Sequence, residues 1–450
     1  MKLITTNVKE QKFFAVTEIE PGNRPENHEN SIINVFDEVK YQEITGFGGA
    51  FTEAAAYNYA KMSEKNKELV RRAYFDPVEG IGYNFGRTHI NSCDFSLAPY
   101  TYVEEGDKTL ATFDLGQDKK YVLPFLKDAL STVKEDLILF ASPWSPPAYM
   151  KETGDVMRGG KLSEEYKSLW AHYYAKYIKA MAAEGVTVSA ITIQNEPLAS
   201  QPWESCQYSA EDEAEFAEKY LIPALDEEGL SHIKILVWDH NKERVYDRAK
   251  KILRSDLLKE RIWGVGHHWY SGEHFEGLKL VYEVLGKQLV CSEFCCGIYT
   301  DLVKHAELYA KEICEDLNNY TTAICDWNLI LSEIGGPFHN RRYRANSAEM
   351  DPDDGCLAPI LYNAEKDEVK VTPCYYYIGH FSKYVKRGAR RIATTKFTSD
   401  LHVAAFENPD GEKVLVALNM TDKDREIVVR HNDVCTALTL AAHSIATVLF

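Results

Sequence analysis

A-I-T-I-Q-N-E-P, residues 190–197, has the pattern of a buried β-strand that runs into an amide, a carboxylate and a proline. Apolar and β-branched residues fill the first four positions, which is typical of a strand covered on both faces. Pro197 cannot donate to a strand ladder, so the strand has to end at Glu196. A carboxylate in that place is either a helix cap or a group that does chemistry, and the surrounding sequence decides between them.

Seven further segments share the apolar strand pattern, and all eight alternate with helix-like stretches. The expected strands are ITGFGGAF (44–51), YNFGRTHI (83–90), LILFASPW (137–144), VSAITIQN (188–195), IKILVWD (233–239), IWGVGHHW (262–269), QLVCSEF (288–294) and TAICDWNL (322–329). Helices are expected over 63–75, 301–319 and 163–185, the last with Ser163 as N-cap and Gly185 after its end. This pattern predicts the α/β class and a (β/α)₈ TIM barrel. An open doubly wound sheet is the alternative, disfavoured because no G-x-G-x-x-G follows the first strand.

The two ends of the chain have a different pattern from the middle. Residues 1–43 contain short alternating runs, and residues 389–450 contain several more, separated by turn signals such as N-P-D-G. We therefore expect three parts: N-terminal strands in 1–43, the barrel in 44–388 and C-terminal strands in 389–450. Both termini would build one attached β-sandwich. No Pro/Gly/Ser-rich linker separates it from the barrel, so the two parts should pack rigidly.

Composition limits the classes of partner. The 450 residues carry a formal net charge of −17, which disfavours nucleic acid and anionic membranes as partners and suits a small neutral substrate. No run of eighteen apolar residues predicts a membrane span, and the N-terminus shows no secretory signal. The ten cysteines are scattered and without zinc-site spacing, so we expect reduced thiols. A cytoplasmic enzyme or binding protein is expected.

Acidic residues stand at five of the expected strand ends, where barrel enzymes carry their chemistry. They are Asp94, Glu196, Asp239, Glu293 and Asp326. A metal site is one interpretation, and the histidines for it would come from His267, His268 and His274. Adjacent residues on a strand point to opposite faces, so His267 and His268 are not expected to share a metal.

Glu196 and Glu293 form the most informative pair, because their strands lie nearly across the barrel from one another. Two carboxylates that flank one small cavity suit glycosidic cleavage: one protonates the leaving oxygen and the other attacks or stabilises the anomeric carbon. The alternative is that each glutamate is a cap or a rim salt-bridge partner. Trp203 and Tyr208, in the loop after Glu196, are candidates for the pocket mouth or are ordinary core.

Several motifs, in order from about residue 40 to the C-terminus, resemble the glucosylceramidase-like enzymes of glycoside hydrolase family 30. They are GFGGAFTEAA (46–55), YNFGRTHINSCDFS (83–96), ASPWSPPAYMK (141–151), NEP (195–197), HWY (268–270), CSEFC (291–295), DWNL (326–329) and GHFSKY (379–384). The resemblance implies a retaining enzyme with Glu196 as acid/base and Glu293 as nucleophile. It implies sugar-binding roles for Asn195, Asp94, Trp144 and Trp327, positions beside the nucleophile for Arg87 and Tyr270, and a pocket-lining position for His268.

A retaining reaction makes further demands on the pair. The negative charge of Glu293 should raise the pKa of Glu196, so that one carboxyl is protonated while the other is ionised. Arg87 would keep the nucleophile charged. The two carboxyl groups should lie about 5–5.5 Å apart, closer than in inverting enzymes. No metal or organic cofactor is needed.

The sequence departs from the family pattern after D-W-N-L. The family continues G-G-P-N and a short loop, whereas this chain reads G-G-P-F-H-N-R-R-Y-R-A-N-S-A-E-M-D-P-D-D-G over 335–355, with Phe338 in place of the amide. Loops at this rim select the substrate, so the insertion at 338–355 leaves the aglycone and the sugar open. It is either a solvated insertion or a contact in a homo-oligomer.

The leading hypothesis is a cytoplasmic exo-β-glycosidase that acts on a small β-linked glycoside, with β-glucoside as the expected substrate. β-Xyloside and β-1,6-linked glucan fragments are alternatives. Transglycosylation or phosphorolysis would use the same pair of glutamates with another acceptor. A catalytically silent sugar-binding barrel is the alternative from another class, disfavoured because both glutamates are present.

Overall fold

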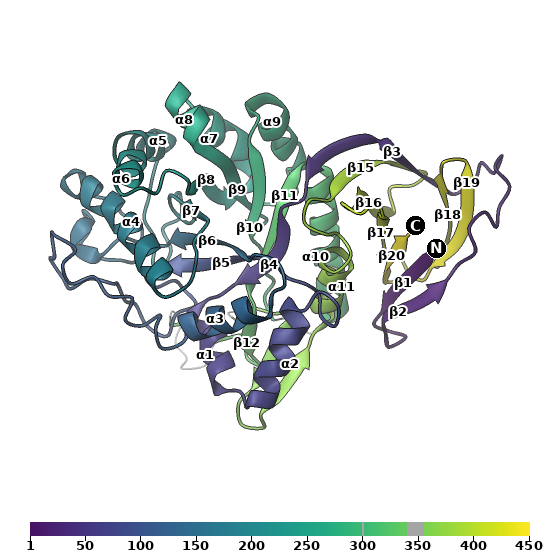
Figure 1. The fold of residues 1–450 in the computed structure, drawn as a ribbon, viewed down its shortest axis with the longest axis horizontal. Coiled ribbons are helices and arrows are strands. Elements are labelled where there is room, and N and C mark those ends of the chain that lie inside the picture. Colours follow the sequence, from purple (N-terminus) through teal and green to yellow (C-terminus); the bar gives the residue numbers. More distant parts are fainter. Residues whose placement is uncertain (299–300, 340–354) are drawn as a thin grey trace, which may run out of the picture.

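The computed structural model describes residues 1–298, 301–339 and 355–450, and it shows the expected barrel joined to a β-sheet domain (Figure 1). Within these ranges eight parallel strands close the barrel in the order β10-β11-β4-β5-β6-β7-β8-β9. They are β4 (Gly46–Ala50), β5 (Phe85–Ile90), β6 (Ile138–Pro143), β7 (Ala190–Thr192), β8 (Lys234–Asn241), β9 (Ile262–His268), β10 (Gln288–Glu293) and β11 (Thr321–Asn328). Each overlaps one of the eight predicted segments, so the (β/α)₈ prediction is confirmed.

Helices surround the barrel and cover the outer face of its strands (Figure 1). They are α1 (Glu53–Lys61), α2 (Glu64–Phe75), α3 (Val122–Thr132), α4 (Lys167–Ala183), α5 (Ala210–Phe216), α6 (Ile222–Glu227), α7 (Val245–Ile252), α8 (Asp256–Arg261), α9 (Phe275–Leu285), α10 (Leu302–Asn318) and α11 (Pro373–Ser382). The helix predicted over 163–185 begins as a 3₁₀ turn, Glu164–Tyr166, and Ser163 makes no side-chain capping bond. Gly185 follows its end with φ +82°, as expected.

An apolar layer fills the interior of the barrel toward the amino-terminal ends of the strands. Its buried members are Phe85, Phe140, Ala190, Leu236, Val290, Ala323 and Cys325, one or more from most of the strands. Gly48 of β4 has to be glycine, because a Cβ there would lie 1.5 Å from the carbonyl oxygen of Phe85. Two residues further along β5, β6 and β10 stand Arg87, Ser142 and Ser292. Their side chains form the next layer, which is polar and lies at the bottom of the candidate site.

Both chain ends build the second domain, which confirms the prediction of a β-sandwich made from the two termini. Nine strands pair in the order β19-β18-β3-β15-β16-β17-β20-β1-β2 within the described ranges. They are β1 (Lys2–Asn7), β2 (Lys12–Glu18), β3 (Ile32–Glu43), β15 (Arg390–Lys396), β16 (Leu401–Glu407), β17 (Lys413–Asn419), β18 (Arg425–His431), β19 (Val434–Leu440) and β20 (Ser444–Leu449). Residues from β1, β3 and β15–β20 share one apolar core.

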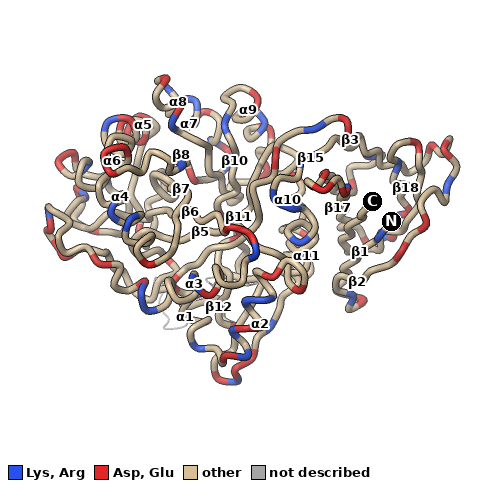
Figure 2. Tube along the Cα trace, in the orientation of Figure 1, with Lys and Arg blue, Asp and Glu red and all other residues tan. Residues whose placement is uncertain are grey.

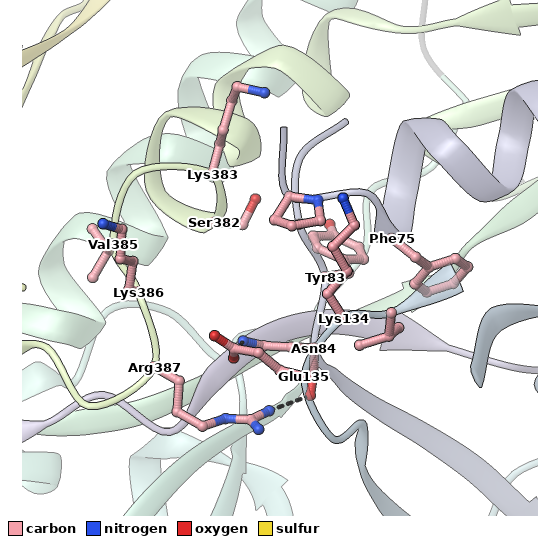
Figure 3. Close-up of a pocket in the computed structure, with 13 residues that line it drawn as sticks. Phe75, Tyr83, Asn84, Lys134, Glu135, Ser382, Lys383, Val385, Lys386 and Arg387 are labelled. Carbon is pink, nitrogen blue, oxygen red and sulfur yellow. Dashed lines mark hydrogen bonds between the residues drawn. The ribbon is translucent and has the colours of Figure 1, made fainter. Parts of the chain in front are cut away.

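Arg387 joins the two domains at the amino-terminal end of the barrel. Its guanidinium donates to the carbonyl oxygens of Thr45 (2.9 Å), Asn84 (2.6 Å) and Asp136 (2.7 Å). Thr45 and Asn84 directly precede β4 and β5, and Asp136 lies two residues before β6. Figure 3 shows Arg387 reaching Asn84 beside a cavity of about 160 Å³. Lys383 donates to the carbonyl oxygens of Val78 and Gly80 on the same side. This end of the barrel is held by bonds to the backbone.

The remaining described elements are a small sheet and the outer surface. Strands β12 (Ile330–Ser332), β13 (Ile360–Asn363) and β14 (Glu368–Val371) pair with one another after β11. Basic residues are interspersed with acidic ones along the outer helices (Figure 2). Among the described residues, no helix combines the length and the apolar character needed to cross a membrane.

Candidate active site

Irregular strand ends bring the polar side chains together at the carboxyl end of the barrel. The pairing of β10 with β9 shifts register between Cys291 and Glu293. As a result two consecutive side chains, Ser292 and Glu293, both face the barrel interior: Ser292 donates to Asp239 Oδ1 (2.6 Å) and Glu293 accepts from Arg87. Such bulges are frequent next to active sites, because they re-aim a side chain.

The end of β8 and the turn after β7 are held in a strained conformation. Glu196 has φ +46°, Asp239 φ +46° and Trp238 φ +72°, values that non-glycine residues rarely adopt. The N–H of Glu196 donates to the carbonyl oxygen of Asp239 (2.9 Å), which ties the two turns together. Backbone strain of this kind persists where surrounding contacts over-determine it, and it is concentrated at functional sites.

Arg87 is the centre of the polar layer and is completely buried. One terminal nitrogen donates to Glu293 Oε2 (2.7 Å), and the other donates to Asp239 Oδ2 (2.8 Å) and Asn195 Oδ1 (2.9 Å). Its Nε donates to Ser142 Oγ (3.1 Å). A rigid planar guanidinium therefore fixes side chains from four strands or strand ends at once.

Both carboxyl oxygens of Glu293 accept hydrogen bonds from neighbouring side chains. Besides Arg87, the hydroxyl of Tyr270 donates to its Oε1 (2.9 Å), so both carboxyl oxygens are oriented. Burial raises the pKa of Glu293 above its ordinary value and the charge of Glu196 adds to this, while His268, Arg87 and Tyr270 oppose it. The sequence-predicted neighbours Arg87 and Tyr270 both contact this carboxyl group.

Glu196 faces two imidazoles. Its Oε1 lies 3.3 Å from Nδ1 of His268 and 3.6 Å from Nδ1 of His240. The Nε2 of His268 contacts Asp239 Oδ1 (3.0 Å). Burial would lower the pKa of His268, but the charge of Glu293 and the bonds to Asp239 and Glu196 raise it to about 9.

The pKa of Glu196 differs in direction from the sequence-based expectation. Burial would raise it, but the hydrogen bond and charge of His268 and the charge of His240 outweigh burial and hold it below its ordinary value. The expectation rests on the charge of Glu293 and on partial burial, and it does not include the two histidines. In the resting site the proton lies on His268, one hydrogen bond away from the carboxylate that would deliver it.

Asp94 lies on another side of the site, near Glu204 and His339. Its Oδ1 is buried without a hydrogen-bond partner among the described residues, and burial together with Glu293 and Glu204 raises its pKa well above the ordinary value. Glu204 accepts from Ser92 (2.5 Å) and contacts Nε2 of His339 (3.0 Å). An unpartnered buried carboxyl oxygen is suited to a ligand hydroxyl.

Trp144 and Trp327 form one wall rather than two separate platforms. Their rings stack 5.2 Å apart, and both lie over the Arg87 guanidinium, at 4.8 and 5.5 Å. Each is about 2% exposed. The predicted stacking of these indoles on a sugar stays a prediction, because much of each face is covered by the other indole and by Arg87.

Two residues named from the sequence, Tyr208 and Asp326, lie away from the site. Trp203 is partly buried and packs against the main core, and its predicted place at the pocket mouth stays a prediction. Tyr208 is buried under α5, where its ring packs edge-on against Phe216. Asp326 is completely buried on the outer face of β11, with its charge acting on Tyr74 and Tyr83, so it takes no part in the site.

The three histidines considered for a metal do not converge. His267 contacts Thr321, His268 points into the site, and His274 stands at the N-cap position of α9 without a side-chain capping bond. The insertion predicted at 338–355 begins inside the described ranges: Phe338 packs against Phe95 and His339 contacts Glu204. Residues 340–354 of the predicted insertion lie outside the described residues.

Sequence reasoning missed several members of the site. Asp239 was noted as a strand-end acid without a role, although it connects Arg87, His268 and Ser292. His240 is not among the predicted site residues, and simple alternation along β8 would place it opposite Asp239. A histidine directly after a strand-end acid, in W-D-H, was the available signal.

The arrangement can do a definite kind of chemistry. One carboxylate is fixed by a cation and a phenol, so it can act as a nucleophile. The other is fixed beside an imidazole that holds a proton, so it can give and take a proton. Both belong to one buried network at the mouth of the barrel.

The sequence matches two known domains of one family along most of its length. Residues 44–385 match the glycosyl hydrolase family 30 TIM-barrel domain, and residues 388–448 match the glycosyl hydrolase family 30 beta sandwich domain.

Individual relatives agree with these matches. Lysosomal acid glucosylceramidase of Mus musculus is 31% identical over 447 residues, covering 93% of this chain and 83% of that protein. The crystal structure of SrfJ from Salmonella typhimurium superposes with a TM-score of 0.94 at 33% identity, covering 100% and 99% of the two chains. The endo-β1,6-glucanase BT3312 superposes with a TM-score of 0.86 at 28% identity, covering 99% and 98%.

Proposed function

Because the chain belongs to glycosyl hydrolase family 30 and is a glycoside hydrolase, we propose that it is a retaining exo-β-glycosidase whose preferred substrates are β-glucosides. The observation that carries the proposal is the pair of differently held glutamates. Glu293 accepts bonds from Arg87 and Tyr270, and Glu196 stands beside a proton-bearing His268. The glucosylceramidase relative supports glucose as the sugar.

In the first half-reaction Glu293 attacks the anomeric carbon and the glycosidic bond breaks. Glu196 delivers a proton to the leaving oxygen, and the proton reaches it from Nδ1 of His268 across the 3.3 Å contact. The product is a glycosyl ester of Glu293. Arg87 then loses one of its two carboxylate partners and keeps Asp239, so the guanidinium stays paired.

In the second half-reaction a water molecule attacks the anomeric carbon of the ester. Esterification removes the charge of Glu293, and that charge was one of the causes that raise the pKa of His268. Glu196, again ionised, takes the proton of the water while the bond to Glu293 breaks. Two inversions give a product with the β configuration of the substrate.

Exo action is supported by the side of the site around Asp94. Glu204, held by Ser92 and His339, stands next to Asp94, and Phe338 packs on Phe95. The described residues Phe338 and His339 thus crowd the region around Asp94, a residue that resembles a sugar-binding aspartate. Crowding at this end favours a terminal sugar over the interior of a longer chain.

A second candidate is cleavage of β-1,6-linked glucan, supported by the similarity to an endo-β1,6-glucanase at 28% identity. The two candidates differ in their products from β-1,6-linked gluco-oligosaccharides. Exo action releases glucose from the first time points, whereas endo action first gives a ladder of shorter oligosaccharides.

The test is a panel of nitrophenyl α- and β-glycosides, β-xyloside included, with proton NMR of the first-formed anomer. Wild type should hydrolyse the β-glucoside fastest and release β-glucose. Glu293→Gln should lose turnover, while Glu307→Gln, a buried glutamate of α10 that contacts His443, should keep it. Binding without turnover by wild type would favour a sugar-binding barrel, and a glucosyl phosphate product in phosphate buffer would favour phosphorolysis.

We place the enzyme in the cytoplasm, acting on small imported glycosides. The ten cysteines, all within the described ranges, are free thiols in the structure, and Cys295 and Cys356 stay unbridged with their sulfurs 3.7 Å apart. Reduced thiols suit a reducing compartment. Alkylation in rapidly quenched cells should label ten thiols, and cell fractionation checks the location.

The insertion at 338–355 is interpreted from the sequence as a solvated segment or as a contact in a homo-oligomer. Light scattering tests whether the chain forms such an oligomer.

A further inference from the structure

The carboxyl end of the barrel gathers three metal-ligand atoms that the proposed reaction does not need as a set. Glu196 Oε1, His240 Nδ1 and His268 Nδ1 all lie within 4.8 Å of one another. Two of the separations are 3.3 Å and 3.6 Å, both measured from Glu196 Oε1. His240 Nδ1 is buried, and among the described residues it has no hydrogen-bond partner.

These separations fit a small dication. Zn²⁺ takes histidine nitrogen and carboxylate oxygen at about 2.0–2.2 Å, so two ligands at a tetrahedral centre are roughly 3.4 Å apart. The set of two imidazoles and one glutamate is also a ligand set that zinc accepts, with its fourth position open. The glutamate of this set is the residue that, in the proposed reaction, has to reach the leaving oxygen.

The neighbours of His268 orient it as a ligand. Its Nε2 contacts Asp239 Oδ1 at 3.0 Å, and Asp239 is in turn fixed by Arg87 (2.8 Å) and Ser292 (2.6 Å). A carboxylate behind a histidine fixes the tautomer and makes the opposite ring nitrogen a better donor to a metal. Glu196 is fixed as well, because its N–H donates to the carbonyl oxygen of Asp239.

From this geometry we propose that Glu196, His240 and His268 form a binding site for a zinc-class divalent transition metal, and that the bound metal switches the enzyme off. The binding claim stands on the three ligands alone, and the inhibition claim rests on the proposed function. A metal on Glu196 Oε1 removes the oxygen that exchanges the proton with the substrate. It would act as an inhibitor and not as a cofactor.

Zinc binding is measured by titration calorimetry with ZnCl₂, and the coordination by the visible absorption of the Co²⁺ form. Wild type should bind one Zn²⁺ per chain. His240→Gln should weaken binding at least about 10–100-fold, by analogy with losses at metal-supporting residues. His172→Gln, at a partly exposed histidine on α4, is the matched control and should bind as wild type does. Thermal melting checks that each variant is folded.

A rival for zinc lies close by, in the thiols of Cys295 and Cys356. If Cys356→Ser abolishes binding while His240→Gln keeps it, or if the Co²⁺ spectrum shows thiolate charge transfer, the proposal is overturned. Unchanged affinity in His240→Gln would overturn it equally.

The activity arm uses each variant's own zinc-free rate as reference. Zinc should lower kcat of wild type, EDTA should restore it, and the inhibitory concentration should rise at least about tenfold in His240→Gln. Binding in calorimetry without inhibition would refute the inhibitory role. A chain that binds zinc but hydrolyses no glycoside would refute the proposed function and leave the metal site standing.

Discussion

Two arginines at opposite ends of the same barrel make different kinds of contact. Arg87, at the carboxyl end, is completely buried and donates to Glu293 and Asp239, which are charged, and to the amide of Asn195. Arg387, at the amino end, donates to three backbone carbonyl oxygens around the starts of β4, β5 and β6. The first organises side chains, and the second holds strands in place.

The difference shows how the barrel separates function from stability. The carboxyl end combines positive-φ residues and an unpartnered aspartate oxygen, both of which cost stability. At the amino end, Arg387 and Lys383 satisfy neutral acceptors. We expect changes at the carboxyl end to affect the chemistry, and changes at the amino end to affect the free energy of unfolding alone.

Glu196→Ala should give the largest effect on rate. The variant loses the general acid, so hydrolysis of glycosides with poor leaving groups should fall by about 10²–10⁴-fold. Dinitrophenyl glucosides, whose leaving group needs no proton, should lose much less in the first half-reaction. The unfolding free energy should fall by about 1–3 kcal/mol, because the buried His268 loses a charged hydrogen-bond partner. An equal loss for both leaving groups would contradict the acid role.

Arg87→Met should affect both properties, because the same guanidinium organises the site and neutralises two buried acids. Removing one partner of a buried ion pair costs about 3–5 kcal/mol of unfolding free energy. Misplacement of Glu293 and Asn195 should lower kcat/KM by about 100-fold or more. Denaturant unfolding and kinetics on the same preparation measure the two losses. A fully active Arg87→Met would break the proposed division between the two ends.

His268→Gln should change the response to pH. The pKa of His268 is about 9, raised above its ordinary value, so its stabilising contribution is complete below about pH 6.5 and is lost as pH rises through 9. Wild type should lose up to about 3 kcal/mol of unfolding free energy over this interval, a loss that the variant lacks.

The alkaline limb of the kcat profile should also move to lower pH in His268→Gln, because Glu196 alone then holds the proton. Denaturant titrations at pH 6.5, 7.5 and 9 and the pH–rate profile measure both shifts. Parallel stability curves for the two proteins would contradict the raised pKa.

Arg387→Met should give the smallest change in rate. Three carbonyl oxygens lose their donor at a half-buried site, so unfolding free energy should fall by about 1–3 kcal/mol. The kcat should stay within about twofold of wild type. Lys386→Ala is a control at the neighbouring position: it breaks a surface pair with Asp410 and should change stability by less than about 1 kcal/mol. A large loss of kcat in Arg387→Met would show that the two ends are coupled.

The sequence predicted those features that follow from local pattern. Eight apolar runs placed the eight strands, and N-E-P and C-S-E-F placed Glu196 and Glu293 at strand ends. Alternation along β11 would also have placed Asp326 correctly, because its neighbour Cys325 lies in the barrel interior and Asp326 on the outer face.

The remaining features depend on backbone geometry that the pattern does not contain. Asp239 and His240 are adjacent, yet both face Glu196 or its partners, because β8 shifts register between Trp238 and His240 and the chain adopts positive φ there. The pKa of Glu196 could not be predicted without these histidines. Ser292 and Glu293 share one face for the same reason, a register shift in β10. A two-residue period predicts neither case.

The central claim is that Glu293 becomes covalently attached to the sugar while Glu196 only moves protons. Peptide mass spectrometry after reaction with an activated 2-deoxy-2-fluoro-β-glucoside tests it most directly, because the fluorine slows breakdown of the ester. We predict one fluoroglucosyl group per chain, on Glu293. A label on Glu196, Asp94 or Asp239, or no label in an enzyme that turns over β-glucosides, would contradict the account.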